Sequence, residues 1–463
     1  MKRDMRMRGR TCSALAQSFP IALCCALMMS AWLAVSSSAQ QDYWGEVRKS
    51  EAARTPIVIE DFPVDASLGF TAFYYDGQTP EDLLAQDLVN MSVFQVVRQR
   101  AGDAAPAVLD VNGDPVTNAI VARVRGRIIG GRGGPQLDLE LLEEGTRAEI
   151  IRCSYPVFSE GEAQPDRWQI HIWADSVTRY LTGSPGCAAT RIAFLREGGS
   201  GKELYLIDWD GKEEEAVTGM ATVLVSPEWH PGGKRIAFTS FHRGQPLLVS
   251  LDLATRRMIT LSDKRTPSAG AYSPSGRQIA FSAATTGDAE IYVARSDGSH
   301  PERLTFDKGI DTAPSWSPSG DRVVFTSDRR GTPQLYVMDA DGSNVAQLTF
   351  DGKWNDSPDW SPNGERIVYV CSVDGRFEVA VVSSSGLSVP RIVTRGGGCE
   401  DPHWAPDSRH VVFSRSIGGQ RNLWIVDVDT GSLRQLTFSR AQTYNPAWSP
   451  LAERRIRASR ETG

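Results

Sequence analysis

Residues 311–350 read DTAPSWSPSGDRVVFTSDRRGTPQLYVMDADGSNVAQLTF, and this stretch decides the fold of more than half of the chain. Short apolar runs alternate in it with turn sequences rich in Gly, Pro, Asp and Ser, which predicts four strands at 315–317, 322–327, 334–339 and 345–349. The second and third runs are apolar on successive residues, as in strands covered on both faces. One such unit cannot bury its own faces, so it needs neighbours of the same kind.

An aromatic residue recurs at almost fixed spacing through residues 229–448, with one gap of 43 followed by four gaps of 44. A period of this length with four strands per unit is the signature of a β-propeller. We therefore predict a six-bladed β-propeller over residues 187–450. We expect the aromatic residues to pack between blades rather than to form a ring that stacks on a ligand. They are Trp229, Tyr272, Trp316, Trp360, Trp404 and Trp448.

The two ends of the repeat array complement each other. The array begins at Arg191 with the second strand of a blade, and it ends at Trp448 with the first strand of a blade. The numbers of first and second strands balance only if the C-terminal strand completes the blade begun near residue 191. We therefore predict a ring closed by strand exchange, which leaves no open sheet edge.

Residues 56–186 have a different texture, with strands bracketed by helices, and predict a small α/β domain. Thr79 followed by Pro80 and two acidic residues is a typical helix start. A later apolar stripe at helical spacing ends at Gly183, a typical helix stop. Residues 40–55 are expected to form a flexible segment and residues 451–463 a charged tail.

The N-terminal 39 residues read as a signal peptide, with five basic residues, then an apolar stretch over 19–35, then small residues before a cleavage point between Ala39 and Gln40. Retention as an uncleaved anchor is the alternative. Cleavage would remove five positive charges and one negative charge and take the formal charge from −6 to −10. We expect an acidic exported protein, and this charge argues against nucleic acid as a partner.

Four cysteines remain after the signal segment, and an oxidising compartment would allow three pairings of them. Cys371 and Cys399 are the candidate pair, because the end of one strand and the loop before the next first strand share a propeller face. Two free thiols or another pairing are the alternatives. No CxxC pair and no Cys/His cluster with zinc spacing occurs, so no metal is expected.

Other candidate sites have simpler interpretations. The glycine-rich stretch 130–134 lacks the ending of a phosphate loop and is expected to be a hairpin. His171 and Asp175 lie one helical turn apart without a third ligand nearby, which favours a solvated helix face over a metal site. The histidines of the repeats occupy different repeat positions, and no GxSxG elbow occurs. We expect no catalytic residue and no cofactor.

Two stretches resemble the TolB family of the Tol-Pal envelope system. The repeat at 311–350 is similar to the family's propeller repeat, and ADSVTRYLTGSPGCAATRIAFL at 174–195 is similar to the junction where the last helix of its N-terminal domain leads into the first blade. The resemblance implies a non-enzymatic periplasmic scaffold that binds the peptidoglycan-associated lipoprotein Pal through a propeller face. It also implies contact with TolA through the N-terminal segment and a role in outer-membrane constriction at division and in envelope integrity.

The family's partner-facing loops match the loops that precede the recurring aromatic residues. The resemblance therefore implies partner contacts at Arg265, Thr266, Ala269, Asp311 and Thr312. The alternative for each is an ordinary solvated loop residue. The competing functions are an enzyme of the propeller peptidase or lyase type and an exported propeller that binds a small ligand or glycan.

Overall fold

The computed structural model describes residues 54–451 apart from 69–76, 101–107, 110–114, 117–120, 132–133, 158–166, 200, 221, 243, 265–266, 269 and 286. The expected signal segment with Ala39 and Gln40, residues 40–53 and the tail from 452 lie outside the described residues.

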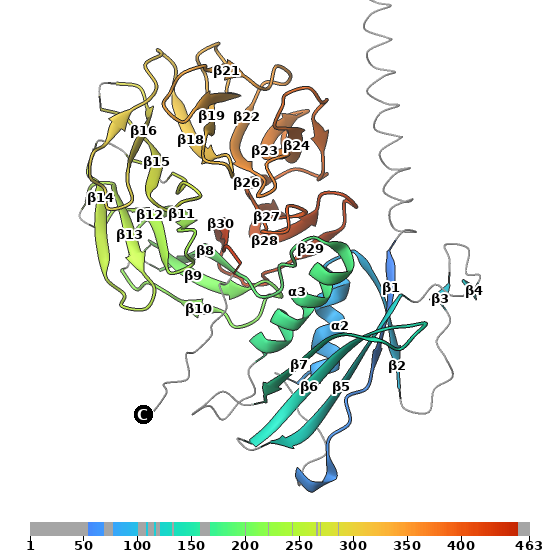
Figure 1. Ribbon diagram of the computed structural model, residues 1–463. Helices are drawn as coiled ribbons and strands as arrows, with labels where there is room; N and C mark the ends of the chain where they lie inside the picture. Colours follow the sequence, from blue (N-terminus) through green and yellow to red (C-terminus); the bar gives the residue numbers. More distant parts are fainter. Residues whose placement is uncertain are drawn as a thin grey trace, which may run out of the picture. The chain divides into compact units, whose positions relative to one another are not determined.

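The N-terminal part is a five-stranded sheet in the order β2-β1-β5-β6-β7 with two helices, as predicted (Figure 1). β1 runs parallel to β2 and β5, whereas β5, β6 and β7 are antiparallel. The bounds are β1 (Thr55–Glu60), β2 (Phe94–Gln99), β5 (Ala122–Gly131), β6 (Gly134–Glu143) and β7 (Glu149–Pro156), with a single 3-10 turn η1 (Ala66–Leu68) and a separate short pair β3 (Val108–Leu109) and β4 (Pro115–Val116). Gly131 pairs with Gly134, so the glycine-rich stretch is a hairpin turn, as expected.

The helices begin and end at the residues that the sequence indicates. α2 (Pro80–Asn90) starts after Thr79, whose Oγ1 accepts a hydrogen bond from the Asp82 N–H at 3.3 Å. α3 (Trp168–Thr182) ends at Gly183, which adopts φ 76° and donates its N–H to the Arg179 carbonyl. Ile170, Trp173 and Val177 of the apolar stripe of α3 are fully buried in a core shared with the sheet and α2, Leu181 is half-buried against it, and Tyr180 is exposed.

Six sheets follow, one per blade, and blades 1 to 6 are defined in chain order. Blade 1 contains β8 (Arg191–Gly198), β9 (Gly201–Asp208), β10 (Glu215–Ala216) and β30 (Thr443–Trp448), and blade 2 contains β11 (Leu224–Trp229), β12 (Arg235–Ser240), β13 (Leu247–Asp252) and β14 (Met258–Ser262). Blade 3 contains β15 (Gln278–Ala283), β16 (Glu290–Arg295) and β17 (Glu302–Arg303), and blade 4 contains β18 (Asp311–Trp316), β19 (Arg322–Ser327), β20 (Gln334–Asp339) and β21 (Ala346–Gln347). Blade 5 contains β22 (Asn355–Trp360), β23 (Arg366–Val373), β24 (Arg376–Ser383) and β25 (Arg391–Ile392), and blade 6 contains β26 (Cys399–Trp404), β27 (His410–Ile417), β28 (Gln420–Asp427) and β29 (Leu433–Gln435).

The ring is closed by its own C-terminus, which confirms the prediction of strand exchange. β30 pairs antiparallel with β8, with Trp448 opposite Ile192 and Thr443 opposite Arg196. In Figure 1 the red β30 lies beside the green β8, although the two strands come from opposite ends of the array.

The recurring aromatic residues are buried between blades, as predicted. Their exposed fractions lie between 2% and 6%. Trp229, Trp316 and Trp404 each donate their indole N–H at 3.1 Å to the carbonyl directly before the corresponding aromatic residue of the preceding blade. Trp360 instead bonds the Gly364 carbonyl of its own blade. The recurring position therefore supplies a buried ring in all six blades and, in three of them, a hydrogen bond to the preceding blade.

Blade 3 departs from the repeat at its inner edge. In the described part of its inner segment, the pairing consists of the bridges Ser268 to Ser282 and Tyr272 to Ile279. Gly270 stands where the other blades have proline, and a Cβ there would lie 1.3 Å from the Ala280 carbonyl oxygen. Only glycine allows this close approach of two backbones.

The connection from α3 to β8 joins the α/β domain to the ring. Asp175 accepts hydrogen bonds from the backbone N–H groups of Ala188 and Ala189 at 2.7 and 2.9 Å. Thr190 accepts the indole N–H of Trp448 at 2.7 Å, so the connection also contacts the strand that closes the ring. Burial raises the pKa of Asp175 to about 7, against the lowering effect of these two N–H groups.

The expectation of a solvated face at His171 and Asp175 is wrong. His171 is fully buried, and its Nδ1 lies 2.7 Å from Asp87 Oδ2 of α2. Trp209, in the connection between β9 and β10, donates its indole N–H to the other oxygen of Asp87 at 3.0 Å. This face of α3 is polar because it packs on α2 and blade 1 through a buried hydrogen-bond network, not because it meets water.

Candidate functional site

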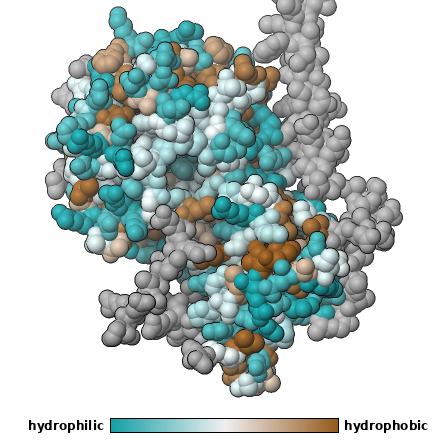
Figure 2. Space-filling view, viewed as in Figure 1, coloured by the Kyte–Doolittle hydropathy of each residue, from teal (hydrophilic) through white to brown (hydrophobic). Residues whose placement is uncertain are grey.

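The inner strands of the ring surround a channel with a cavity of about 150 Å³. Around the central hollow, Figure 2 shows surface that is largely hydrophilic or intermediate in hydropathy. All six blades contribute to the lining, each through the residues just before its recurring aromatic residue.

Among the described residues, a strained residue lines the channel in five of the six blades. Each has a positive φ between 46° and 53° and is followed directly by proline, and it lies at a register shift in the pairing of its inner strand. A non-glycine residue in this region costs about 1–2 kcal/mol, and such strain concentrates at functional sites. The residues are Ser226, Ala313, Ser357, Asp401 and Asn445.

The bulge turns the next side chains toward the channel, where four of them form a polar chain. His403 Nε2 lies 3.4 Å from Glu228 Oε2, and His403 Nδ1 lies 3.6 Å from Asp359 Oδ2. Asp359 Oδ1 accepts the hydroxyl of Ser315 at 3.0 Å. The chain thereby links blades 2, 6, 5 and 4 across the channel.

The charge of this chain is set by burial and by its carboxylates. Burial alone lowers the pKa of His403, but the charge of Asp359 and the hydrogen bond and charge of Glu228 outweigh it and raise the pKa to about 10. Burial raises the pKa of Glu228, and the bond to His403 opposes this. His403 is therefore an imidazolium at neutral pH, held between two carboxylates.

A second layer of acidic groups lies at the end of the channel where the inner strands begin. Asp401 Oδ2 accepts the amide of Asn445 at 2.7 Å. Burial, together with the nearby Glu400 and Asp356, raises the pKa of Asp401 to about 7. Arg421 holds Glu400 through two hydrogen bonds. This end of the channel combines acidic groups with a fixed guanidinium, an arrangement that suits recognition of polar partner groups.

The structure describes two of the five predicted partner residues. Arg265, Thr266 and Ala269 lie outside the described residues. Asp311 and Thr312 begin β18, at the same end of the channel as Asp401. Asp311 is fully buried, and its Oδ2 accepts a hydrogen bond from Arg329 at 2.8 Å, so it holds the neighbouring loop. Thr312 is half-buried beside the channel-lining Ala313.

The predicted Cys371–Cys399 disulfide is not formed in the structure, where both residues are free thiols. Glu378 lies against the pair: it is opposite Cys371 in the pairing of β23 with β24, and its Oε2 is 3.9 Å from Cys399 Sγ. Burial raises the pKa of Cys371 to about 12 and that of Cys399 to about 11, so neither supplies much attacking thiolate at neutral pH. The bond stays a prediction for the oxidised protein.

The sequence analysis missed Glu228, Asp359 and His403. The spacing of the recurring aromatic residues could have identified them. The residue directly before each aromatic residue has the same spacing and lies at the same place on the channel wall. The histidines of the repeats occupy different repeat positions and, in the described part of the chain, do not meet one another. The partners of His403 are instead carboxylates, Glu228 and Asp359, which occupy the same repeat position as His403 in other blades.

The fold and channel define a class of protein: an α/β domain joined to a six-bladed propeller that its C-terminal strand closes. The family model described as "TolB beta propeller domain" matches residues 178–452. The chain therefore belongs to the TolB family.

The relatives that match the chain carry the same name. The Tol-Pal system protein TolB of Anaeromyxobacter dehalogenans (strain 2CP-C) is 34% identical over 268 residues, which cover 55% of this chain and 58% of that protein. That of Bordetella avium is 36% identical over 143 residues, 30% of this chain and 32% of that protein. The matched segments thus span 58% of the length of the first relative and 32% of the length of the second. Their names refer to a system rather than a reaction, and membership of this family agrees with the expectation that the chain is not an enzyme.

A solved structure extends the similarity beyond the propeller. The crystal structure of TolB from Acinetobacter baumannii superposes with a TM-score of 0.71 at 25% identity, covering 86% of this chain and 97% of that one. Within the described part of this chain, neither helix is long and apolar enough to span a bilayer.

Proposed function

We propose that this protein is the TolB component of a Tol-Pal envelope system. It acts in the periplasm after removal of residues 1–39, as a scaffold that binds a Pal-type outer-membrane lipoprotein and supports outer-membrane constriction at division and envelope integrity. The observation that carries this proposal is the match of both domains to a TolB structure, with 97% of that chain covered.

The channel end where the inner strands begin is the proposed lipoprotein site. It contains the five strained residues, the acidic groups around Asp401 and the half-buried Thr312. Strained backbone is retained where a partner requires a fixed loop shape, and charged groups at a rim favour correct encounter. The turn from β13 to β14 lies at the opposite end of the strands.

The channel favours a protein partner over a small ligand or glycan. Its cavity of about 150 Å³ is below the roughly 300–1,000 Å³ of sites that enclose drug-sized ligands. The polar chain through His403 also fills the lumen with paired groups, which leaves the rim as the surface available for contact.

The test is capture of the lipoprotein from envelope extracts by the purified protein. Thr312→Glu adds a bulky charge at the proposed site, and we expect it to weaken capture about 10-fold or more, equivalent to about 1.4 kcal/mol. Thr255→Glu is the matched control, because Thr255 is exposed on the turn between β13 and β14 at the opposite end of the strands. The double variant with Thr266→Glu should capture least.

The outcomes separate the function from the site. If the unaltered protein captures no peptidoglycan-associated lipoprotein, the proposed function is wrong. If Thr312→Glu and Thr255→Glu capture as much as the unaltered protein, the function stands and the proposed site is rejected.

Contact with TolA is the second part of the proposal, and we assign it to residues 40–55. Deleting these residues should abolish capture of TolA while leaving capture of the lipoprotein intact. Retained TolA capture would place that contact elsewhere on the protein.

A further inference from the structure

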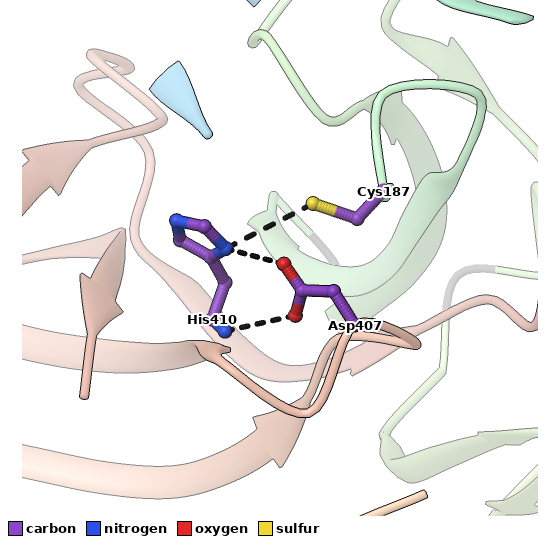
Figure 3. A group of neighbouring side chains, drawn as sticks. All are labelled: Cys187, Asp407 and His410. Carbon is purple, nitrogen blue, oxygen red and sulfur yellow. Dashed lines mark hydrogen bonds and ion pairs between the residues drawn. The ribbon is translucent and has the colours of Figure 1, made fainter. Parts of the chain in front are cut away.

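A thiol, an imidazole and a carboxylate from distant parts of the chain meet behind the channel wall, at the junction of the two domains (Figure 3). Cys187 comes from the connection between α3 and β8, Asp407 comes from the turn between β26 and β27, and His410 is the first residue of β27. His410 Nδ1 lies 4.0 Å from Cys187 Sγ and 2.6 Å from Asp407 Oδ2. One ligand atom from each residue lies within 4.8 Å of the others, and Cys187 is 0% and His410 2% exposed.

These three groups form a ligand set suited to a thiophilic divalent cation. Zinc combines Cys sulfur, His nitrogen and carboxylate oxygen, with bond lengths that put neighbouring ligand atoms of a tetrahedron roughly 3.3–3.6 Å apart. The observed separations of 4.0 and 2.6 Å lie on either side of this range. The nitrogen–oxygen separation would have to open by roughly 0.7–1.0 Å and the nitrogen–sulfur separation to close by roughly 0.4–0.7 Å, changes that side-chain rotations on both partners can supply.

A second group of potential metal ligands consists of His171, Asp208 and Asp210, and it differs from the first in the partners of its carboxylates. Asp210 is paired with Arg167, and Asp208 with Arg191 at 3.0 Å, so guanidinium groups already neutralise both carboxylates. Asp407 has no arginine partner among the described ion pairs, and its one ion-pair partner there is His410. The charge that neutralises Asp407 is thus a proton on an imidazole, which a metal ion can replace.

The site also has room for a fourth ligand. A cavity of about 240 Å³ adjoins it, lined by Asp407, Ser408 and Arg409 on the propeller side and by residues of α3 and of the segments that follow α2 and α3 on the other. The two arginines of this cavity are paired, Arg409 with Asp427 at 2.8 Å and Arg366 with Asp429 at 2.7 Å. A water molecule in the cavity can complete the tetrahedron that is usual for zinc.

We propose that Cys187, Asp407 and His410 form a binding site for one zinc ion, or a similar thiophilic divalent cation, that ties the interdomain connection to blade 6. Binding replaces the thiol proton of Cys187 and the Nδ1 proton of the His410 imidazolium, and both protons pass to solvent. Burial and the charge of Asp407 raise the pKa of Cys187, whereas a bound cation favours the thiolate.

The test is zinc titration of the reduced, chelator-stripped protein against a chromogenic chelator. We expect one tight site per chain. Cys187→Ser should weaken zinc affinity at least ~100-fold, since loss of an outer-shell partner alone costs 10–100-fold. Cys371→Ser is the matched control, because Cys371 is also a buried thiol but lies in blade 5, and it should bind zinc like the unaltered protein.

Two further readouts keep the test decisive. Cobalt(II) should give a thiolate-to-metal absorption band in the unaltered protein and in Cys371→Ser but not in Cys187→Ser. Zinc should raise the unfolding temperature of the unaltered protein. If Cys187→Ser does not fold, Asp407→Asn replaces it, with the same expected loss of affinity.

The proposal is overturned if the folded, reduced protein binds no stoichiometric zinc. It is also overturned if the folded variant binds zinc as tightly as the unaltered protein. These results do not depend on lipoprotein capture, so the zinc site and the proposed function are tested separately.

Discussion

At the scale of single residues, the channel is organised around one imidazolium. His403 reaches Glu228 of blade 2 from blade 6, although β30 of blade 1 lies between the two inner strands. The residue of β30 at the same repeat position is Ala447, whose methyl group leaves room for this contact. A small residue in one blade therefore decides which charged residues of its neighbours can meet.

The raised pKa of His403 predicts a pH-dependent stability. The imidazole has a pKa of about 6.5 when unfolded and about 10 in the folded protein. Because the folded state holds the proton more tightly, the stabilisation is complete below about pH 6.5 and is lost as the pH rises through about 10. His403→Gln should be less stable than the unaltered protein at pH 6, with the difference shrinking toward pH 10.

Urea unfolding at several pH values measures this difference. His300→Gln, at an exposed turn, is the control and should show a difference that does not change with pH. A His403→Gln deficit that is constant from pH 6 to pH 10 would contradict the assigned charge state.

At the scale of elements, five of the six blades are held by a repeated side-chain bridge between their two outer strands, as seen in the described residues. A threonine after the last strand accepts a backbone N–H at 2.9 Å and donates its hydroxyl to the acidic or amide residue that begins or nearly begins the third strand. In blade 4, Thr349 accepts from Leu335 N–H and donates to Gln334 Oε1 at 2.8 Å. The five threonines are Thr218, Thr305, Thr349, Thr394 and Thr437.

Thr349→Val tests the value of this bridge. Valine keeps the shape but leaves the buried N–H of Leu335 without an acceptor, which should cost about 1–3 kcal/mol of unfolding free energy. Thr349→Ser keeps the hydroxyl and should lose much less. Denaturant unfolding of both variants measures the difference, and equal loss would show that the methyl packing, not the hydrogen bond, matters.

At the scale of the whole molecule, ring closure and the domain junction meet at the same place. Trp448 of the closing strand donates to Thr190, and the same connection is held to α3 by Asp175. Ala447 of that strand also accepts the indole N–H of Trp229 from blade 2. Opening the ring would therefore disturb both neighbouring blades and the connection to the α/β domain.

Removal of residues 443–463 should unfold the propeller. Truncating a single buried tryptophan side chain typically costs about 3–5 kcal/mol of unfolding free energy. Removing a whole inner strand costs more than this, which is a large share of the roughly 5–15 kcal/mol that stabilises typical proteins. Removal of residues 452–463 alone spares β30 and is the control. Circular dichroism during heating measures both, and an unchanged transition in the longer deletion would contradict closure by β30.

Much of the fold could be predicted because its determinants are local. The aromatic period, the strand and turn alternation, the helix start at Thr79 and the helix stop at Gly183 each depend on residues within a few positions of one another. Even ring closure could be predicted, because the array begins with the second strand of a blade and ends with the first strand of a blade. The sequence by itself thus determined the number of blades, their order and the strand that joins the two ends.

Only the tertiary structure decided which side chains meet. Cys187 and His410 lie 223 residues apart, and His171 and Asp87 lie 84 apart. The spacing of such residues in the sequence does not predict their contact. The distance between them depends on how the α/β domain packs on the ring and on the width of the closed ring. That packing buried His171, brought His403 to Glu228 and assembled the proposed zinc site, since burial and contact across a ring are properties of the closed molecule.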